Sequence, residues 1–360
     1  MNNDKNYEVE DLKKDNITIL CTGSHGHIGS YVIEWLCKVC TNSTIICVDN
    51  RYNSNFDNLT ESREWARKNK NRLLFDSNHL SVDITNQYAL EDIFSWFLPE
   101  YVCHQASMLT LDTKKFRLDG IRTNIMGFAN IIELCKKYST KKFVFASSAS
   151  VYGNPKEVPV SETHDFNNTT LLYGATKIAN EYLARSYADE EGLKILGLRP
   201  FNVYGYRQSM KNVYIQIVPE FIQSILNNKI HEAHDDGQTT LDLIHGKDAG
   251  YFYVKALFDD SLYRIKDEFD GFINLGTGVS TSVIQLYHLI REAISNHDID
   301  VSKSDLKVKE SVEDFHDIHH VRRRQADVTL LNEKLGRHKI EVPEGIQDTV
   351  EQILKKKKVI

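Results

Sequence analysis

The sequence predicts a doubly wound α/β protein: a parallel sheet covered by helices on both faces, with a smaller α/β lobe beside it. Short apolar runs rich in β-branched residues alternate with amphipathic stretches of helical length between residues 17 and 203, which is the rhythm of a parallel sheet with crossover helices. A glycine-rich turn directly follows the first apolar run, at the place where such sheets bind their ligands. With 360 residues, the chain can bury a large core in one or two closely joined domains.

The glycine-rich turn joins the first expected strand, residues 17–21, to a helix with an apolar face. Gly23 allows the tight turn, Gly26 lets a pyrophosphate approach the backbone, and Gly29 lets the helix pack closely on the strand. The N-terminus of that helix offers free N–H groups and the positive end of its dipole to phosphates. The turn therefore predicts a Rossmann-like dinucleotide site.

Asp49 determines the expected choice of dinucleotide. It follows the second expected strand, residues 44–48, and lies twenty residues beyond Gly29. A carboxylate at this position accepts hydrogen bonds from both ribose hydroxyls, whereas its negative charge opposes a 2′-phosphate. We therefore expect NAD as the cofactor in preference to NADP.

The remaining elements continue the alternation and then lose it. After the second strand we expect, in chain order, a helix over 57–71, a strand over 73–82, a helix over 88–97, a strand over 101–104, a helix over 120–137, a strand over 143–146, a helix over 174–190 and a strand over 195–198. Beyond residue 203 we expect a helix near 215–227, short strands near 230–245, a strand at 272–275 that returns to the sheet, and a helix near 281–295. The predicted boundaries are 15–203 with the return near 247–276 for an NAD-binding domain, and 204–246 with 277–354 for a substrate-binding lobe.

Composition argues against several classes of partner. The net charge of -6 gives no general attraction to nucleic acid or to a membrane surface, and no apolar run approaches transmembrane length. The polar, acidic start is unlike a targeting peptide, so a cytoplasmic location is expected. No metal site is expected either: Cys37 and Cys40 have no second pair, and the spacing of His316, His319 and His320 does not bring them together.

A tyrosine and a lysine four residues apart form the candidate catalytic pair. Tyr173 and Lys177 share one face at the start of an expected helix. Because a nearby ammonium favours the phenolate, we expect the pKa of Tyr173 to fall from about 10 toward neutrality, which would make it a general base. Serine hydroxyls at 147–150 directly follow the strand at 143–146, where one can hydrogen-bond the reacting oxygen.

Together these motifs resemble the extended short-chain dehydrogenase/reductase family, and within it the NAD-dependent epimerases and dehydratases, specifically the nucleotide-sugar 4-epimerases. The resemblance covers roughly residues 17–350, and the segments that carry it are 22–29, 148–153, 173–177, 198–205 and 321–327. It implies three catalytic residues, which are Ser148, Tyr173 and Lys177.

The resemblance also implies which residues contact the ligands. The expected cofactor contacts are Gly23, Gly26, His27, Ile28, Gly29, Asp49, Asn50, Asp83, Ile84, Gln105, Ala106, Ser107, Asn124, Tyr173 and Lys177. The expected substrate contacts are Ser148, Tyr173, Asn202, Arg322 and Arg324.

The reaction that the resemblance implies is an epimerisation. Tyr173 removes the proton of the sugar 4-hydroxyl while NAD takes the C4 hydride, the 4-keto sugar turns over in the site, and the hydride returns to its other face. The expected substrate is therefore a nucleotide sugar. The expected partner is a second copy of the chain, joined through the helices at 120–137 and 174–190.

Three positions depart from the family pattern. Leu241 stands where an arginine normally binds the diphosphate, His27 where an aromatic residue is usual, and Leu172 where a proline precedes the tyrosine. We therefore expect Arg322 to be the main diphosphate ligand. Arg324 matches a position that borders the sugar ring, where it should crowd an acetamido group or attract a uronate. A hexose or uronate is accordingly favoured over an N-acetylhexosamine.

Other functions stay open. A dehydrogenase or reductase of the same family is compatible with the same residues. A dehydratase fits less well, because Ala149 and Ser150 occupy the positions of its Asp-Glu pair. A non-catalytic NAD-binding protein is disfavoured by the complete catalytic set, although Leu241 keeps it open.

Overall fold

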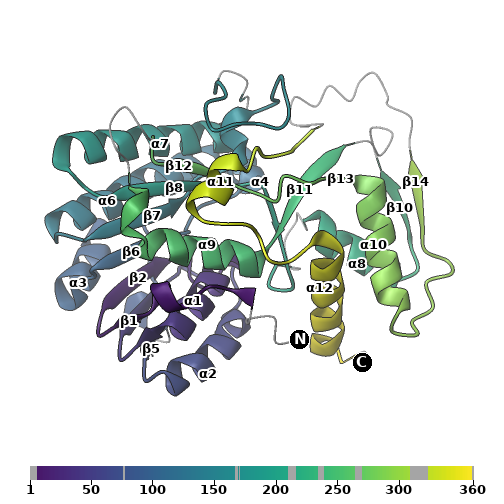
Figure 1. Ribbon diagram of the computed structural model, residues 1–360, viewed down its shortest axis with the longest axis horizontal. Helices are drawn as coiled ribbons and strands as arrows, with labels where there is room; N and C mark the ends of the chain where they lie inside the picture. The colour runs from purple at the N-terminus through teal and green to yellow at the C-terminus, as the bar shows by residue number, and fades with distance from the viewer. Residues whose placement is uncertain are drawn as a thin grey trace.

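A seven-stranded parallel sheet forms the centre of the molecule (Figure 1). Its order is β5-β4-β2-β6-β7-β8-β12, with bounds Arg72–Leu74, Thr44–Val48, Thr18–Thr22, Tyr101–His104, Lys142–Ala146, Ile195–Pro200 and Phe272–Leu275. The last strand pairs in parallel with β8, so the expected return to the sheet is confirmed. The computed structural model describes residues 6–75, 78–166, 169, 171–209, 216–233, 239–263, 270–308 and 323–358.

Helices cover both faces of this sheet, which confirms the doubly wound α/β fold. One face packs against α1 (His27–Val39) and α9 (Gly246–Phe258), with α2 (Thr60–Lys68) beside α1. The other packs against α3 (Gln87–Phe97), α6 (Gly127–Lys137) and α7 (Leu172–Glu191). Alternate residues of each strand enter opposite cores, as the two-residue period of a strand requires.

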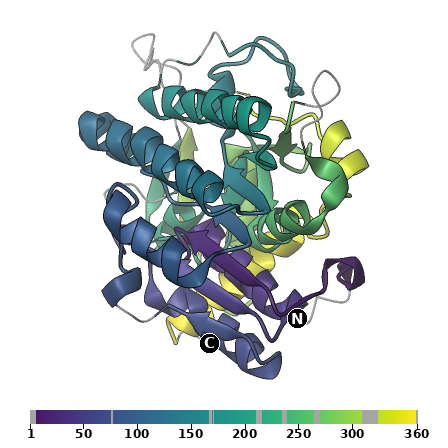
Figure 2. The ribbon, with the colours of Figure 1, turned by 90° about the vertical axis from the view of Figure 1, so that its left-hand side faces the viewer.

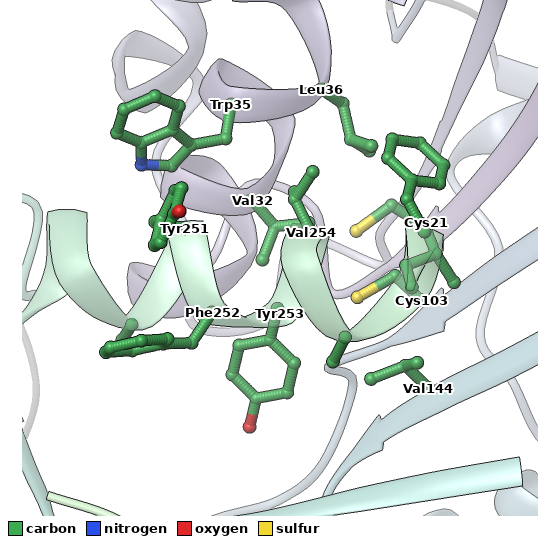
Figure 3. Close-up of a cluster of buried hydrophobic side chains, with 14 of the residues drawn as sticks. Cys21, Val32, Trp35, Leu36, Cys103, Val144, Tyr251, Phe252, Tyr253 and Val254 are labelled. Atoms are coloured by element: carbon green, nitrogen blue, oxygen red, sulfur yellow. The ribbon is translucent and has the colours of Figure 1, made fainter. Parts of the chain in front are cut away.

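The core under α1 and α9 is tightly filled. Val32 and Leu36 of α1 and Val254 of α9 gather there with Cys21 of β2 (Figure 3). The indole N–H of Trp35 donates to the carbonyl oxygen of Lys247 at 2.8 Å, which links α1 to the start of α9. This packing fixes the helix that carries the glycine turn.

The segment before α7 is more broken than expected. The expected helix over 120–137 is present, but α5 (Arg117–Ile121), a π-helical turn (Arg122–Met126) and α6 follow one another within it, and a separate α4 (Thr110–Lys115) precedes them. Apolar spacing shows the face of such a helix, but it does not show a local change of hydrogen-bond period.

The expected strand over 73–82 is wrong in its extent. Strand β5 covers only Arg72–Leu74, and a 3₁₀ turn at Asn78–Leu80 follows. Val82 and Ile84 are nevertheless buried, because they enter the second core from irregular backbone. Their alternation with polar neighbours imitates a strand.

A smaller lobe follows, with its own core. We define it by a three-stranded sheet, a two-stranded sheet and three helices, which Figure 1 shows on the right. The strands are β9 (Asn202–Tyr204), β11 (Thr240–His245) and β13 (Ser280–Ser282) in the first sheet, and β10 (Ile230–Ala233) and β14 (Asp305–Val308) in the second. The helices are α8 (Ile217–Leu226), α10 (Val283–Ser295) and α12 (Val342–Lys356), and α11 (Thr329–Lys334) lies against β12 of the large sheet.

The start of the chain folds against the core, which the sequence did not indicate. Strand β1 (Lys14–Asp15) pairs with β3 (Cys40–Thr41). The ring of Tyr7 lies between those of Trp35 and Tyr251, with centroids at 4.7 and 4.9 Å. Its hydroxyl donates to Asp248 Oδ1 at 2.8 Å.

The described chain gives no sign of a membrane span or a metal centre. Within the described ranges, no helix is long and apolar enough to cross a bilayer, and no group of three potential ligands could hold a metal ion. Cys37 and Cys40 are buried free thiols. Burial raises the pKa of Cys40 to about 12, so it carries no thiolate at neutral pH.

Candidate active site

The glycine turn has the geometry that its sequence predicts. Gly23 has a φ of +65°, and a Cβ there would lie 2.6 Å from the backbone nitrogen of Ala106. A Cβ on Gly29 would lie 2.1 Å from the carbonyl oxygen of Gly23. Helix α1 begins at His27, next to Ile28, and no side chain caps it. Its first N–H groups therefore remain available for a pyrophosphate, and Gly26 at the cap leaves room for one to approach.

Asp49 directly follows β4, as expected, but its carboxylate already holds the surrounding loops. It accepts hydrogen bonds from the backbone N–H of His25 at 2.9 Å, the N–H of Arg51 at 2.8 Å and the hydroxyl of Ser54 at 2.8 Å. A carboxylate has about four acceptor directions, so little capacity remains for both ribose hydroxyls. Its negative charge still opposes a 2′-phosphate.

Three of the expected cofactor contacts, Asn50, Asp83 and Ile84, lie together beyond Asp49. Asn50 Nδ2 donates to Asp83 Oδ2 at 2.9 Å. Burial raises the pKa of Asp83, but hydrogen bonds from Thr85 and Asn50 outweigh it and hold the pKa below its usual value. Ile84 is buried against Gly127, so only its backbone is placed to meet a ligand.

The segment after β6 lies directly on the glycine turn. Gln105 N–H donates to the carbonyl oxygen of Thr22 at 3.0 Å, and Ala106 N–H to the Thr22 hydroxyl at 3.4 Å. Asn124, in the π-helical turn, donates to the Met108 carbonyl at 3.0 Å and to the Thr176 hydroxyl at 3.1 Å, and accepts from the Met108 N–H. The Asn124 amide therefore holds these two segments together, and its expected contact with the cofactor stays a prediction.

The candidate catalytic residues meet at the end of β7. The hydroxyls of Ser148 and Ser107 lie beside the Tyr173 phenol, on which they act as hydrogen-bond donors that favour the phenolate. Lys177 Nζ donates to the carbonyl oxygen of Ala146 at 2.8 Å and lies 5.6 Å from the centroid of the Tyr173 ring. All three candidates, Ser148, Tyr173 and Lys177, are nearly buried.

The expected pKa of Tyr173 is wrong in direction. Burial raises it above 10, and the hydrogen bonds from Ser148 and Ser107 oppose that rise without reversing it. Lys177 is directed at a backbone carbonyl and not at the phenol oxygen, so its charge does not offset the desolvation. Burial also lowers the pKa of Lys177 to about 8, against the opposing charge of Glu181.

A buried ion pair supports this cluster from behind, and the sequence did not reveal it. Arg199 of β8 binds Glu181 of α7 through two hydrogen bonds of 2.8 Å. The hydroxyl of Ser147 donates to the same carboxylate at 2.5 Å, and Arg199 also donates to the Tyr152 hydroxyl at 2.8 Å. The pair therefore fixes Ser147 and Tyr152, which lie on either side of Ser148 in the chain, relative to α7.

A cavity of about 60 Å³ opens beside Ser148. Its lining includes Asn202 of β9 together with Arg323 and Arg324. The side-chain oxygen of Asn202 is buried and has no hydrogen-bond partner among the described residues. Such an atom is costly without a ligand or water to satisfy it, so it marks the cavity as a binding site.

The arginines of the cavity are held there by β11. Arg324 N–H donates to the carbonyl oxygen of Thr240 at 3.2 Å, and Asp242 accepts the Ala326 N–H at 2.9 Å. Leu241, between them, is buried in the core of the smaller lobe and contributes no charge. Arg323 is thus a cavity residue that sequence analysis did not assign.

Several expected residues cannot be placed. Arg322 lies outside the described residues, as do His316, His319 and His320.

His27 is described, and its ring packs against Tyr31 with centroids at 5.8 Å. Burial lowers the pKa of His27 to about 3, so it is neutral beside the expected phosphates.

The glycine turn, the acid after β4 and the tyrosine–lysine–serine cluster define an NAD-dependent protein of the dehydrogenase type, and the residues present fit that cofactor. Comparison with known sequences places the chain further. Residues 19–264 match the model of the NAD dependent epimerase/dehydratase family. The chain belongs to this family.

Similar proteins carry epimerase names. The chain is 30% identical over 279 residues to a putative UDP-glucose 4-epimerase of Methanocaldococcus jannaschii, covering 77% of this chain and 82% of that protein. It is 31% identical over 291 residues to UDP-glucose 4-epimerase 2 of Arabidopsis thaliana, covering 77% and 80%. Among solved structures, the UDP-glucose 4-epimerase of Thermotoga maritima with UDP-glucose has a TM-score of 0.78 and 29% identity, over 95% of this chain and 99% of that one.

Proposed function

We propose that the protein is an NAD-dependent nucleotide-sugar 4-epimerase. One observation supports this most: Ser148, bonded to Tyr173, opens onto the cavity that holds the unpaired Asn202 oxygen and two arginines. A hydroxyl relay, a neutral polar contact and cations are the groups that a sugar diphosphate requires. The named relatives act on UDP-glucose, which points to the same class of substrate.

The reaction assigns one task to each side chain. Tyr173, as phenolate, takes the proton of the sugar 4-hydroxyl and returns it after the 4-keto sugar has turned over. Ser148 hydrogen-bonds the reacting oxygen, and the Lys177 ammonium, 5.6 Å from the centroid of the Tyr173 ring, adds positive charge near the phenolate once it has formed. Bound NAD supplies the redox chemistry, because it accepts the C4 hydride and gives it back to the other face.

Net chemistry of other kinds is less well supported. A dehydratase needs carboxylates beside the catalytic hydroxyl, and no carboxylate lines the cavity in the part of the chain that the structure describes. Ser150, at the position of the expected glutamate, instead bonds the Ser148 hydroxyl at 2.9 Å. A dehydrogenase remains the alternative within the family.

Product analysis tests the proposal. The protein is incubated with a panel of UDP- and dTDP-sugars, once with catalytic NAD and once with NAD in excess over the sugar, and products are separated by chromatography while absorbance at 340 nm is followed. Epimer formation without net NADH supports the proposal. Stoichiometric NADH would indicate a dehydrogenase, and no turnover of any sugar would indicate a binding protein.

For the sugar, we propose a hexose or a uronate. Arg323 and Arg324 add positive charge to the cavity, and a bulky arginine at 324 leaves less room for an acetamido group. Arg322 remains the proposed diphosphate ligand. Kinetics on UDP-glucose, UDP-glucuronate and UDP-N-acetylglucosamine with Arg322→Ala and Arg324→Ser decide this, and a preference of the wild type for the N-acetylated sugar would contradict it.

We also propose that the chain forms a homodimer through the helices that precede and include α7. Figure 2 shows α6 and α7 side by side on one face of the molecule. Around them, exposed apolar side chains gather at Leu118 (67% exposed), Met126 (55%) and Tyr182 (59%). Such a patch on a water-facing surface is typical of an interface between symmetric copies.

A further inference from the structure

The turn at residues 205–208, which we call the junction turn, directly follows the strand that carries Asn202. The turn is fixed by its own hydrogen bonds. Gln208 Oε1 accepts from the Gly205 N–H and Gln208 Nε2 donates to the Val203 carbonyl, both at 3.3 Å. A displacement of the junction turn must therefore move β9 with it.

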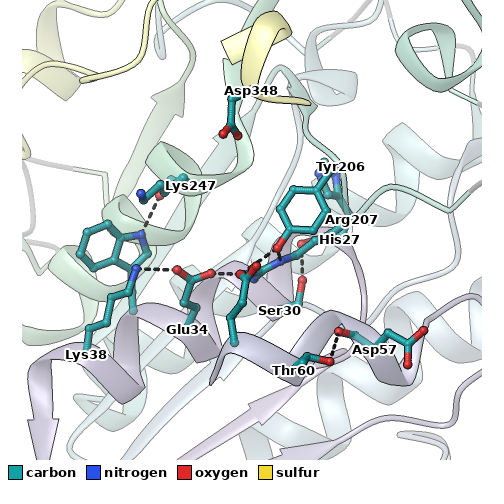
Figure 4. A network of polar contacts seen from close by, with 12 residues as sticks. His27, Ser30, Glu34, Lys38, Asp57, Thr60, Tyr206, Arg207, Lys247 and Asp348 are labelled. Carbon is teal, nitrogen blue, oxygen red and sulfur yellow. Dashed lines mark hydrogen bonds and ion pairs between the residues drawn. The ribbon is translucent and has the colours of Figure 1, made fainter. Parts of the chain in front are cut away.

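The side chain of Arg207 extends from the junction turn to α1 and α2, the helices on the cofactor side (Figure 4). Its Nη2 pairs with Glu34 of α1 and with Glu61 of α2. The guanidinium also lies 4.2 Å from the ring centroid of Tyr31, on α1. Since Arg207 is only 3% exposed, its side chain is enclosed by protein.

A second link joins the junction turn to the glycine turn itself. Asn58 Nδ2 donates to the carbonyl oxygen of His25 at 3.0 Å and to that of Arg207 at 3.3 Å. The N–H of His25, in turn, donates to Asp49. Gly205 lies so close to α1 that a Cβ on it would be 2.6 Å from the hydroxyl oxygen of Tyr31.

We propose that Arg207 is a positioning residue that couples NAD binding to nucleotide-sugar binding. NAD bound at the glycine turn would bias the position of α1, and the buried pairs of Arg207 with Glu34 and Glu61 tie β9 and Asn202 to that helix and to α2. Such a coupling is reciprocal, because each ligand must raise the affinity for the other by the same factor. The inference rests on the proposed function for the place of the nucleotide sugar.

A purely structural role makes a different prediction. A buried ion pair that only stabilises the fold lowers the melting temperature when it is removed, but the folded molecules then bind both ligands with unchanged coupling. The quantity to measure is therefore the coupling factor, which is the ratio of the dissociation constants for one ligand without and with the other.

Calorimetry gives this factor directly. NAD is titrated into the protein with and without saturating UDP, and UDP with and without saturating NAD; UDP lacks a sugar, so no turnover occurs. For the wild type we expect about 5-fold or more, at the low end of common allosteric couplings. Arg207→Met should reduce the factor below about 2-fold, and Glu61→Ala, which removes a half-exposed partner but keeps Glu34, should give an intermediate value.

Arg291→Met is the matched control. Arg291 bonds Ser304 and Val301 inside the smaller lobe, so the same substitution there should leave the coupling factor at the wild-type value. A wild-type factor in cooperatively folded Arg207→Met overturns the proposal; if that variant does not fold, a wild-type factor in Glu61→Ala overturns it. A wild type that binds both ligands without coupling also overturns it, whereas a wild type that binds NAD but neither UDP nor dTDP counts against the proposed function itself.

Discussion

The phenol of Tyr173 lies in surroundings that favour its neutral form. It is buried beside two serine hydroxyls, and the nearest cation points elsewhere. As a general base it depends on being converted to the phenolate when the site is filled, where the positive charge of oxidised NAD favours the anion. Its reactivity is therefore a property of the loaded site.

Replacement of the hydroxyl tests this role. Tyr173→Phe keeps the ring in its buried place but removes the proton acceptor, so turnover should fall by about 10²–10⁴-fold with little change in unfolding. Tyr182→Phe is the control, because it makes the same change on the exposed side of α7. Near-normal turnover in Tyr173→Phe would show that another residue is the base.

Lys177 gives the site a pH dependence. Burial lowers its pKa to about 8 from 10.5, so its charge is present below this pH and is lost as the pH rises through it. The rate constant kcat/KM should therefore decline above about pH 8, and Lys177→Met should lack that decline while showing low activity throughout.

Stability should change in the opposite direction, which separates the two effects. The native pKa of Lys177 lies below the unfolded value, so between about pH 8 and 10.5 the unfolded state binds more protons. The contribution of this group to the free energy of unfolding then rises with pH. The difference between wild type and Lys177→Met in urea melts measures it, and a parallel loss of stability and activity would contradict the assignment.

At the residue scale, the sequence predicted which side chains form the candidate site, but it did not predict the contacts that surround them. The spacing of Tyr173 and Lys177 indicated that they share a helix face, and they do. It could not show the direction of the Lys177 side chain, because a strand distant in sequence supplies the carbonyl that binds it. Arg207 was missed for a similar reason: its partner Glu34 is 173 positions away.

Among the elements, the glycine turn has the least tolerance for change. A Cβ on Gly29 would meet backbone atoms at 2.1 and 2.9 Å, so Gly29→Ala should cost about 1–3 kcal/mol of unfolding free energy and weaken NAD binding with it. Gly192→Ala is the control: nothing lies within 4 Å of a Cβ there, and only its left-handed backbone is strained. It should cost about 1 kcal/mol and leave NAD affinity unchanged; equal NAD affinity in both variants would contradict the prediction.

The helices around α7 are expected to carry the subunit interface. Light scattering should give twice the chain mass of 41.4 kDa at micromolar concentration. The double variant Leu118→Glu/Met126→Glu places two charges on the apolar patch and should give a monomer, since buried unpaired charges oppose association. Val308→Glu, at an exposed apolar residue of β14, should remain dimeric. A monomeric wild type would contradict the proposal.

The sequence predicted elements best where one chemical constraint fixed them. Strand β2, helix α1 and strand β4 lie within a residue or so of their expected bounds, because the glycines and Asp49 define their ends. The extent of β5 was misjudged because Val82 and Ile84 are buried from irregular backbone, and the π-helical turn was missed because its hydrogen-bond period changes where the helix packs against α7. Nothing in the polar start indicated β1, whose pairing is with a strand 26 positions away.

At the scale of the whole molecule, the first residues attach the start of the chain to the core. Asp248 accepts the Tyr7 hydroxyl at 2.8 Å and the N–H groups of Lys339 and Ile340 at 3.0 Å, so one buried carboxylate joins the start, α9 and the approach to α12. Tyr7→Phe should lower the free energy of unfolding by about 1.5–3 kcal/mol, the range for hydrogen bonds to a charged group. Tyr88→Phe, at 85% exposed, is the control, and equal urea midpoints for the two variants would show that the contact contributes nothing.

The order in which the chain visits the large sheet and the smaller lobe limits how the protein can evolve. It enters the smaller lobe at β9, leaves it at α9 and β12, returns at β13, departs again for α11, and closes on α12. No continuous stretch of gene therefore encodes the lobe, and recombination cannot exchange it as a cassette for one with another preference. New specificities on this scaffold have to arise by substitution in place, and position 241 allows this, because its side chain can change while Asp242 beside it still holds Thr277, Gly278 and Ala326.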